Sequence, residues 1–176
     1  MVGRLISASM VKELGPVRSG LMVSGRVGSG IPAELGSMLV TDQIAALRAL
    51  GTDPVRKLVV PRVLAGVLMM PLLSILATGI GMVGGWIVSL LQFHVASTVY
   101  WTAVVQGLYI QDVWMGIIKP VFLGFTIATI ACHVGLRTTG GTQGVGNATK
   151  LAVVASSVAV IAVDFMVTKV MIVLLY

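Results

Sequence analysis

Four charged side chains stand where this chain is otherwise apolar, and their types and positions could do chemistry. Lys12, Glu13, Lys119 and Asp164 all fall within or beside long hydrophobic stretches. Charges of this kind are costly in lipid, so they usually face a cavity or one another and mark a transport path. They therefore predict either a polar lining for a substrate path or structural ion pairs that hold helices together.

Two of these charges, Lys119 and Asp164, are expected to pair. Asp164 lies thirteen residues into the apolar segment 151–175, which is about 20 Å along a helix rising 1.5 Å per residue. Lys119 stands at the start of the apolar segment 117–136, a position that is predicted to lie near the outer face. The distance along the segment 151–175 brings Asp164 toward the same face. The other two charges, near the start of the first helix, are predicted to lie toward the same side.

The sequence carries no signature of catalysis. The phosphate-cradling pattern G-x-x-x-x-G-K-[ST] does not occur, nor does a Ser/His/Asp or Cys/His arrangement that could be brought together. Cys132 reads as a small packing residue, and His94 and His133 are predicted at opposite depths, so neither a metal site nor a cofactor is expected. We therefore expect a protein that is not itself an enzyme.

The composition predicts a membrane protein. The 176 residues are 57% hydrophobic and only 10% charged, whereas soluble domains are about a quarter charged. A bilayer core of roughly 30 Å needs about 20 apolar residues as a helix. We expect one all-α polytopic membrane domain over 1–176, with about four transmembrane helices at about 8–40, 63–92, 117–136 and 151–175.

The first of these helices is predicted from small residues and not from hydropathy, because it carries several charges. Gly20, Ser24 and Gly28 recur every four residues, and small residues at that spacing let helix backbones approach closely in membranes. A helix packed inside a bundle is one interpretation, and an amphipathic segment on the cytoplasmic side is the other.

The basic residues predict the orientation. The segment 41–62 and the loop 137–150 contain Lys and Arg, whereas the connection 93–116 contains neither. Basic residues stay in the cytoplasm, so the first two face inward and the third outward. Within the outer connection, the uncharged aromatic stretch 96–109 is expected to form an interfacial helix. This ordered distribution also argues against nucleic acid as the reason for the net charge of +6.

The segment 41–62 (TDQIAALRALGTDPVRKLVVPR) predicts two short helices between two spans. Thr41 is a candidate N-cap, with Asp42 favourable in the first turn, and Gly51 is a candidate C-terminal stop. Asp53 and Pro54 then restart a helix as N-cap and first residue. The apolar ridge of the first helix, Ile44, Leu47 and Leu50, suits a groove on a soluble partner or a position on lipid headgroups.

The glycine-rich run GGTQGVG, beginning at Gly140, fits neither a P-loop nor a dinucleotide fingerprint, since no strand precedes it. It is expected to be a flexible inner turn, with Asn147 or Thr149 starting the last span.

One long run of motifs resembles a known family. The run ELGPVRSGLMVSGRVGSGIPAELGSMLVTDQIAALRALGTDPVRKLVVPRVLAG is similar to the MlaE-type permeases of ABC lipid transporters, whose pattern is ELGPV, then GR-G-(small)-AELG, then T-(E/D)-QI-AL---G-DP---L--PR. The likeness continues into GGTQGVGNATK and the span that contains VDF. Family members usually begin with an interfacial helix and one further span before ELGPV. The resemblance therefore implies a fragment, a misassigned start or a shortened member.

The resemblance implies a homodimeric permease subunit in the bacterial inner membrane that moves phospholipid between that membrane and an outer-membrane route. A separate ABC ATPase subunit, an MCE-domain lipid-binding protein on the outer side and often a small cytoplasmic STAS-domain protein would be its partners. The helix 42–51 would be the coupling helix seated in the ATPase, and Lys12, Glu13, Lys119 and Asp164 would be family-like polar positions. The residues implied in ATPase coupling are Asp42, Gln43, Ile44, Leu47, Arg48, Leu50, Gly51, Asp53 and Pro54.

Two other classes of function remain open on the sequence. One is a secondary lipid or small-molecule transporter, coupled to ions through Asp164 and Lys119. The other is a membrane scaffold that transports nothing. A coupling-like helix favours the ATP-driven permease over both.

Overall fold

The computed structural model describes residues 9–92 and 96–175, and His94 therefore lies outside the described residues. Every element of secondary structure in the described residues is helical, which confirms the predicted all-α class. Two π-helical turns, η1 and η2, precede the helices α2 and α4. The elements are η1 (Met10–Leu14), α2 (Gly15–Val40), α3 (Gln43–Ala49), η2 (Val55–Val59), α4 (Val60–Gln92), α5 (Ser97–Gly107), α6 (Ile110–Leu136) and α7 (Gly141–Leu175).

Three helical stretches, 55–92, 110–136 and 141–173, are long and apolar enough to cross a membrane, so this is a multi-pass membrane protein. Half of the apolar window of α6 is buried inside the protein, compared with 11% for the stretch that contains α4 and 17% for α7. The other two helices thus leave most of their apolar surface for lipid, whereas α6 lies at the centre. The more polar helix α2 does not meet the same criteria, and its crossing of the membrane remains a prediction.

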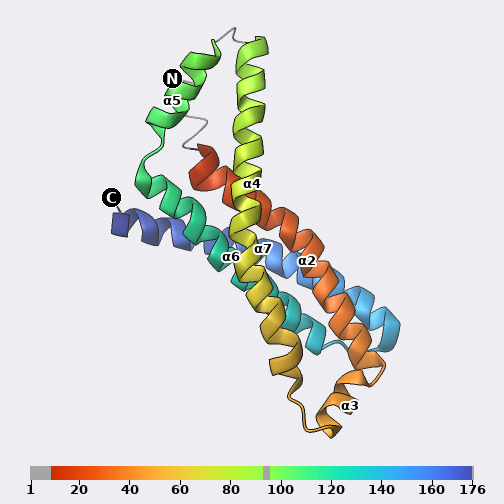
Figure 1. Ribbon diagram of the computed structural model, residues 1–176. Helices are drawn as coiled ribbons and strands as arrows, with labels where there is room; N and C mark the ends of the chain where they lie inside the picture. Colours follow the sequence, from red (N-terminus) through yellow and green to blue (C-terminus); the bar gives the residue numbers. More distant parts are fainter. Residues whose placement is uncertain (1–8, 93–95, 176) are drawn as a thin grey trace.

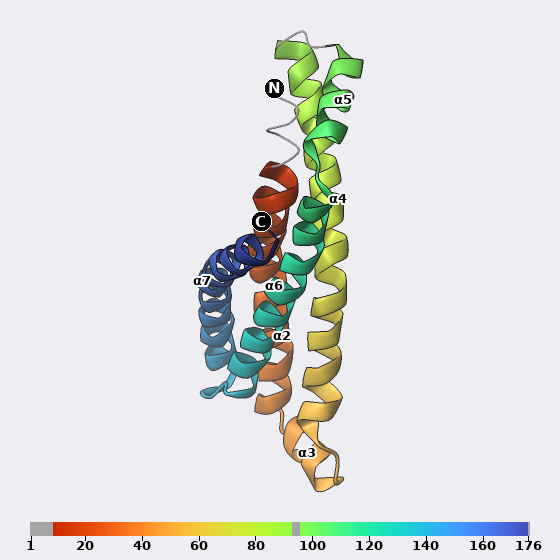
Figure 2. The same ribbon diagram turned by 90° about the vertical axis from the view of Figure 1, so that its left-hand side faces the viewer.

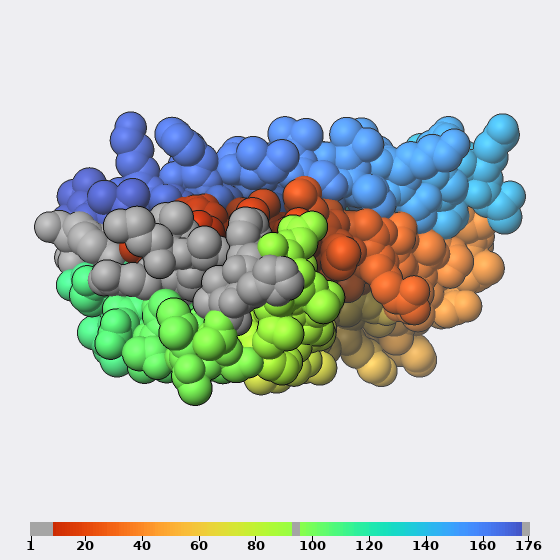
Figure 3. All heavy atoms as spheres, turned by 90° about the horizontal axis from the view of Figure 1, so that it is seen from above, coloured from red at the N-terminus to blue at the C-terminus, as the bar shows by residue number. Residues whose placement is uncertain are grey.

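The long helices form a bundle in which α2 packs against α6 and α7, and α4 packs against α6 and α2 (Figures 1 and 2). Seen from above, α7 covers one side of the molecule and α4 with α5 the other, with α2 between them (Figure 3). The core where these helices meet consists of Met70, Leu123, Ile127 and Val160.

Small residues bring α2 close to α7. Gly20, Ser24 and Gly28 are all buried on α2, and the hydroxyl oxygens of Ser24 and Ser157 lie 2.9 Å apart. A Cβ atom added at Gly28 would lie 2.9 Å from the hydroxyl oxygen of Ser156 on α7. A larger side chain there would force the two helices apart.

The two ends of the bundle differ in charge. The helix α3 and the connection between α6 and α7 lie at one end, and the last turns of α4 and the first turn of α5 lie at the other (Figures 1 and 2). At the first end, the segment 41–62 and the connection 137–140 both carry basic residues. We call this the basic end. The shared location agrees with the predicted alternation of inner and outer connections.

Two helices begin earlier than the apolar runs suggested. The second predicted short helix is not separate, because helix continues from Pro54 through η2 into α4. The helix α6 begins at Ile110 and not near 117, because a carboxylate oxygen of Asp112 accepts the backbone N–H of Tyr109 at 3.3 Å. Such a contact satisfies an otherwise unpaired group at the start of a helix.

The glycine-rich run is mostly helix, so the prediction of a flexible turn with a helix start at Asn147 or Thr149 was wrong. The turn ends at Gly140, and α7 begins at Gly141. Only these two glycines of the run have positive φ angles, +89° and +67°. Gly144 is already helical, and the carbonyl group of Thr139 occupies the space that its Cβ would need. These glycines therefore allow the turn and the first helical residues to approach closely.

Between α4 and α6, the helix α5 is fixed to α4 by one buried aromatic side chain. The hydroxyl of Tyr100 donates a hydrogen bond to the carbonyl oxygen of Met82 at 3.0 Å. Tyr100 is 2% exposed, and this burial raises the pKa of its phenol above the ordinary value. The aromatic segment predicted at 96–109 thus contains the helix α5, which is anchored to the half of α4 that is distant from α3 (Figure 1).

Candidate functional site

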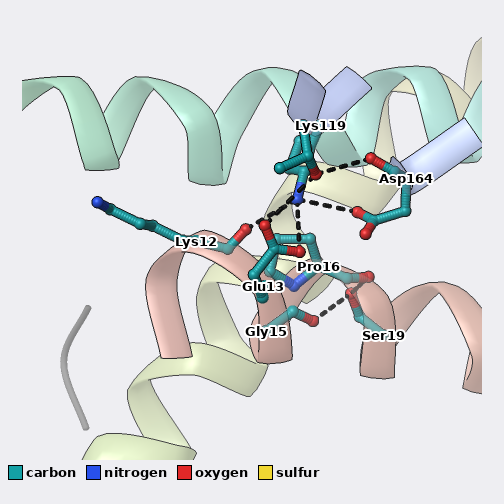
Figure 4. Close-up of polar contacts among 8 residues, drawn as sticks. Lys12, Glu13, Gly15, Pro16, Ser19, Lys119 and Asp164 are labelled. Atoms are coloured by element: carbon teal, nitrogen blue, oxygen red, sulfur yellow. Dashed lines mark hydrogen bonds and ion pairs between the residues drawn. The ribbon is translucent and has the colours of Figure 1, made fainter. Parts of the chain in front are cut away.

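The predicted pair of Lys119 and Asp164 is present, and it belongs to a larger cluster. The ammonium nitrogen of Lys119 on α6 lies 3.0 Å from Oδ1 of Asp164 on α7. It also donates to Oε2 of Glu13 at 2.8 Å and to the backbone carbonyl oxygen of Lys12 at 3.1 Å. Figure 4 shows these three acceptors converging on one ammonium group. Three segments far apart in the sequence are therefore joined through a single cation.

Lys119 is completely buried, whereas its carboxylate partners are not equally so. Its side chain is 0% exposed, compared with 12% for Asp164 and 44% for Glu13. A buried ammonium is tolerated only where acceptors surround it, and the three oxygens supply them. Glu13 remains open enough to meet a ligand or solvent while it holds the lysine.

The position of Lys119 along its helix differs from the prediction. Lys119 is not at the start of its helix, because α6 begins at Ile110. The nine residues from Ile110 to Lys119 correspond to about 14 Å of helix. The cluster consequently lies well inside the bundle and not at its rim. Thr168, one turn after Asp164, also lies near it and donates to Oε1 of Glu13 at 3.3 Å.

Beside this cluster is a second ion pair that the sequence analysis missed. The ammonium of Lys12 lies 2.8 Å from Oδ1 of Asp112, whose side chain is 1% exposed. Asp112 is the only charged residue between Arg62 and Lys119, and this isolation was the signal that could have found it. Lys12 and Glu13 thus use consecutive positions of η1 to bind the first and the third turns of α6.

At the basic end, the helix α3 is bounded by two distinct turns. Its N-cap is Asp42, with a left-handed φ of +57°, and not Thr41 as predicted. The hydroxyl of Thr41 donates back to the carbonyl oxygen of Ser37 at 2.8 Å and so completes α2. Asp is one of the few residues that adopt the left-handed region at low cost, which explains the sharp change of direction after α2.

The C-terminal end of α3 is a Schellman motif. The N–H of Gly51 donates to the carbonyl of Arg48 at 3.0 Å, and that of Thr52 donates to the carbonyl of Leu47 at 3.1 Å. Gly51 has a φ of +72°, which agrees with its predicted role as the stop. Asp53 then accepts the N–H of Val55 at 3.0 Å, as expected for the cap of the next helix. The two ends leave α3 with a fixed length of seven residues.

The apolar ridge of α3 is divided between the protein interior and the surface. Ile44 is 1% exposed, whereas Leu50 is 79% exposed. Leu47 is half-buried, and Arg48 is exposed. Ile44 therefore holds α3 against its own chain, and the surface left for a partner is centred on Leu50 and Arg48. Of the remaining predicted coupling residues, Asp42, Gln43, Gly51 and Asp53 are exposed near the ends of α3, whereas Pro54, at the start of the next helix, is buried.

The model of the family described as "Permease MlaE" matches residues 1–170. The chain belongs to the MlaE permease family. Among curated relatives, a probable ABC transporter permease protein of Rickettsia typhi is 40% identical over 168 residues, which cover 96% of this chain and 65% of the relative. The intermembrane phospholipid transport system permease protein MlaE of Haemophilus influenzae is 36% identical over 171 residues, covering 97% and 66%. A chloroplast protein of Arabidopsis thaliana, TRIGALACTOSYLDIACYLGLYCEROL 1, is 35% identical over 168 residues, covering 96% and 48%.

The chain spans about 65% of the length of the probable permease of Rickettsia typhi.

Two motifs of the MlaE pattern meet at the basic end. Glu34 belongs to the AELG segment of α2, and Arg62 ends the PR segment of α4. Their side chains form an ion pair, with Nη2 of Arg62 lying 2.9 Å from Oε2 of Glu34. The same guanidinium donates through Nη1 to the carbonyl oxygen of Leu58 at 3.0 Å. The pair joins the helices that enter and leave the α3 segment.

Proposed function

We propose that this chain is the permease subunit of an ATP-driven ABC transporter that moves phospholipid between the inner membrane of a bacterium and an outer-membrane route. Membership of the MlaE permease family supports the transport class. The relative from Haemophilus influenzae, named for intermembrane phospholipid transport, supports the lipid cargo.

The observation that carries this proposal is the geometry of α3. Both of its ends are fixed by turns, Ile44 anchors it to the chain, and Leu50 is presented at the surface. A short helix with an exposed apolar anchor and an adjacent arginine suits a groove on a soluble partner. In the chain, α3 lies directly between α2 and the continuous helix of η2 and α4, so a force on α3 reaches two long helices together.

The proposed partner at this surface is a separate ABC ATPase subunit, since the 176 residues contain no phosphate-cradling loop. The assembly would contain two copies of this chain. It would also contain an MCE-domain protein on the outer side and a small cytoplasmic STAS-domain protein. These partners follow from the family resemblance, and the basic end would be the cytoplasmic one.

Within the membrane, the cluster around Lys119 is proposed to border the lipid path. Glu13 and Lys12 retain exposed fractions of 44% and 30%, so both can meet a charged or zwitterionic headgroup. The more deeply buried partners would keep the helices together while the headgroup passes.

Substitution of Leu50 tests the proposed coupling. We expect Leu50→Asp to abolish co-purification of the ATPase subunit, because a carboxylate would replace an exposed apolar anchor. Leu50→Met should retain binding, because it keeps an apolar side chain of similar size. The measurements are ATPase pull-down and lipid transfer between vesicles driven by ATP. Full binding and transport by the Leu50→Asp protein would contradict the proposed role of α3.

Ion-coupled secondary transport is a second candidate, favoured by the buried Lys119 between two carboxylates. Such clusters also occur in proton relays. A lipid-transport assay in vesicles distinguishes the ATP-driven permease from the ion-coupled transporter. Lipid movement driven by an imposed proton gradient without ATP would support ion coupling, and movement only with ATP and the ATPase subunit would exclude it.

A further inference from the structure

An apolar groove runs along the basic half of the bundle, between α2, α4 and α6. Its volume is about 320 Å³. Gly124, Ile127 and Ala128 of α6 form a buried floor, while Met69 and Leu73 of α4 form an exposed wall. Val27 and Ile31 of α2 and Ala65 of α4 also line the groove.

The groove is deep at its α6 side because two glycines let α4 and α6 cross closely. A Cβ atom at Gly66 would lie 3.1 Å from Cβ of Ala128, and one at Gly124 would lie 2.5 Å from the carbonyl oxygen of Gly66. The crossing leaves the small residue Ala65 beside it, where a larger side chain would otherwise narrow the groove. The hollow is thus built by backbone contact and small side chains.

The groove is apolar along its length and charged at one end only. Glu34 and Arg62 are the only charged residues of its lining, and both lie at the basic end. Apolar surface alone says little in a membrane protein, because lipid tails cover it anywhere. The guanidinium of Arg62 at one end would determine the orientation of a bound lipid. The guanidinium can bind an anionic headgroup, while the apolar part of the groove holds the hydrocarbon chain.

The length of the groove matches one leaflet. From Arg62 to Leu73 there are eleven residues of α4, which correspond to about 16 Å of helix. The hydrocarbon core of a bilayer is roughly 30 Å thick, so half of it is about 15 Å. An acyl chain that starts at the level of Arg62 would therefore end near the middle of the membrane.

The ion pair at the end of the groove can exchange partners. Glu34 is 64% exposed and Arg62 only 20%, so the carboxylate can return to water while the guanidinium stays at the groove. Exposed ion pairs contribute little to stability. A lipid phosphodiester carries one negative charge, as a carboxylate does, and likewise presents two oxygens to the planar guanidinium; it would replace Glu34 there.

We propose that this groove binds one glycerophospholipid from the leaflet at the basic end, with its phosphate on Arg62 and one acyl chain along α2 and α4. The site shares no residue with the Lys119 cluster. It is therefore a second lipid-binding position, independent of the transport path proposed above.

The test uses the purified full chain in nanodiscs of phosphatidylcholine that contain a trace of phosphatidic acid with a diazirine on one acyl chain. Cross-linked peptides are identified by mass spectrometry. We expect labels on Val27, Ile31 and Met69. Diacylglycerol carrying the same diazirine but no phosphate should label these residues roughly tenfold less, the factor equivalent to about 1.4 kcal/mol.

Two charge variants give opposite expectations. Arg62→Gln should lower the labelling with phosphatidic acid to the level of diacylglycerol, whereas Glu34→Gln should raise it, because it removes the competing carboxylate. If the two residues served only as a structural pair, both variants would change the labelling in the same direction. That result would overturn the proposal, as would equal labelling by the two lipids in the unmodified protein.

Two tryptophan variants test the groove itself. Ala65→Trp would fill the hollow and should remove the labels. Leu64→Trp, at the neighbouring position outside the lining and 54% exposed, should retain them. Labelling that survives Ala65→Trp would overturn the proposal. No ATPase or nucleotide is present, so a negative result would leave the proposed transport function standing.

Discussion

Removal of the Lys119 ammonium gives the sharpest test of how the bundle is held together. In Lys119→Met the side chain keeps much of its length, but Asp164 and Glu13 lose the cation that lies 3.0 and 2.8 Å away. Breaking a buried pair by removing one partner costs about 3–5 kcal/mol. Glu13 is 44% exposed and can be rehydrated, whereas Asp164 is only 12% exposed. We therefore expect a loss near the lower limit, about 3 kcal/mol.

The matched variant is Asp164→Asn, which leaves Lys119 with Glu13 and the carbonyl of Lys12. It should cost about 1.5–3 kcal/mol, the range for one hydrogen bond to a charged group. The double variant Lys119→Met/Asp164→Asn removes both the cation and its more buried carboxylate partner. Its loss of unfolding free energy should therefore be smaller than the sum of the losses in the two single variants, by about 1 kcal/mol or more.

Reversible unfolding in mixed detergent micelles, followed by circular dichroism, measures these free energies. A loss below about 1 kcal/mol for Lys119→Met would be typical of an exposed ion pair, and would refute the view that the cluster is a buried structural junction. Strictly additive losses in the double variant would show that Lys119 and Asp164 do not interact.

Two further substitutions test the packing of α2 and the stop of α3. Gly28→Leu should lower the free energy of unfolding by about 1–3 kcal/mol, because the backbone of α7 lies beside Gly28 at Val153. The loss should be measured as a lower unfolding temperature. An unchanged temperature would show that the close approach of α2 and α7 is not needed. Gly51→Val should cost about 1–2 kcal/mol, because a β-branched residue would have to adopt a φ of +72°. Faster limited proteolysis in the segment after α3 would indicate this destabilisation. A cleavage rate equal to that of the unmodified chain would contradict the role of Gly51 as the helix stop.

The pairing of Lys119 with Asp164 could be predicted because each was an isolated charge in an apolar run, and helix rise fixes depth. The partnership of Lys12 with Asp112 could not be derived in the same way. It depends on α6 beginning seven residues before its apolar run, and hydropathy does not detect a helix start made by a carboxylate. Depth along a single helix is thus accessible from sequence, whereas the contacts between two helix ends are not.

The segment between α2 and α4 shows a similar division. Gly51 and Asp53 were recognisable because each has one dominant local role. Thr41 was assigned to the wrong helix, because its hydroxyl can accept a bond from the following helix or donate to the preceding one. The glycines after Gly140 were misread for a related reason: in a membrane bundle, glycine serves close packing as often as flexibility.

The length of α4 has a mechanical consequence. Its 33 residues extend about 50 Å, well beyond the roughly 30 Å of hydrocarbon. One end of α4 lies next to α3 and its far part lies beside α5 (Figure 1), so this helix would act as a lever arm. A swing of about 10° at the foot would displace the tip by about 9 Å. Small movements delivered on one side of the membrane would thereby become large strokes on the other.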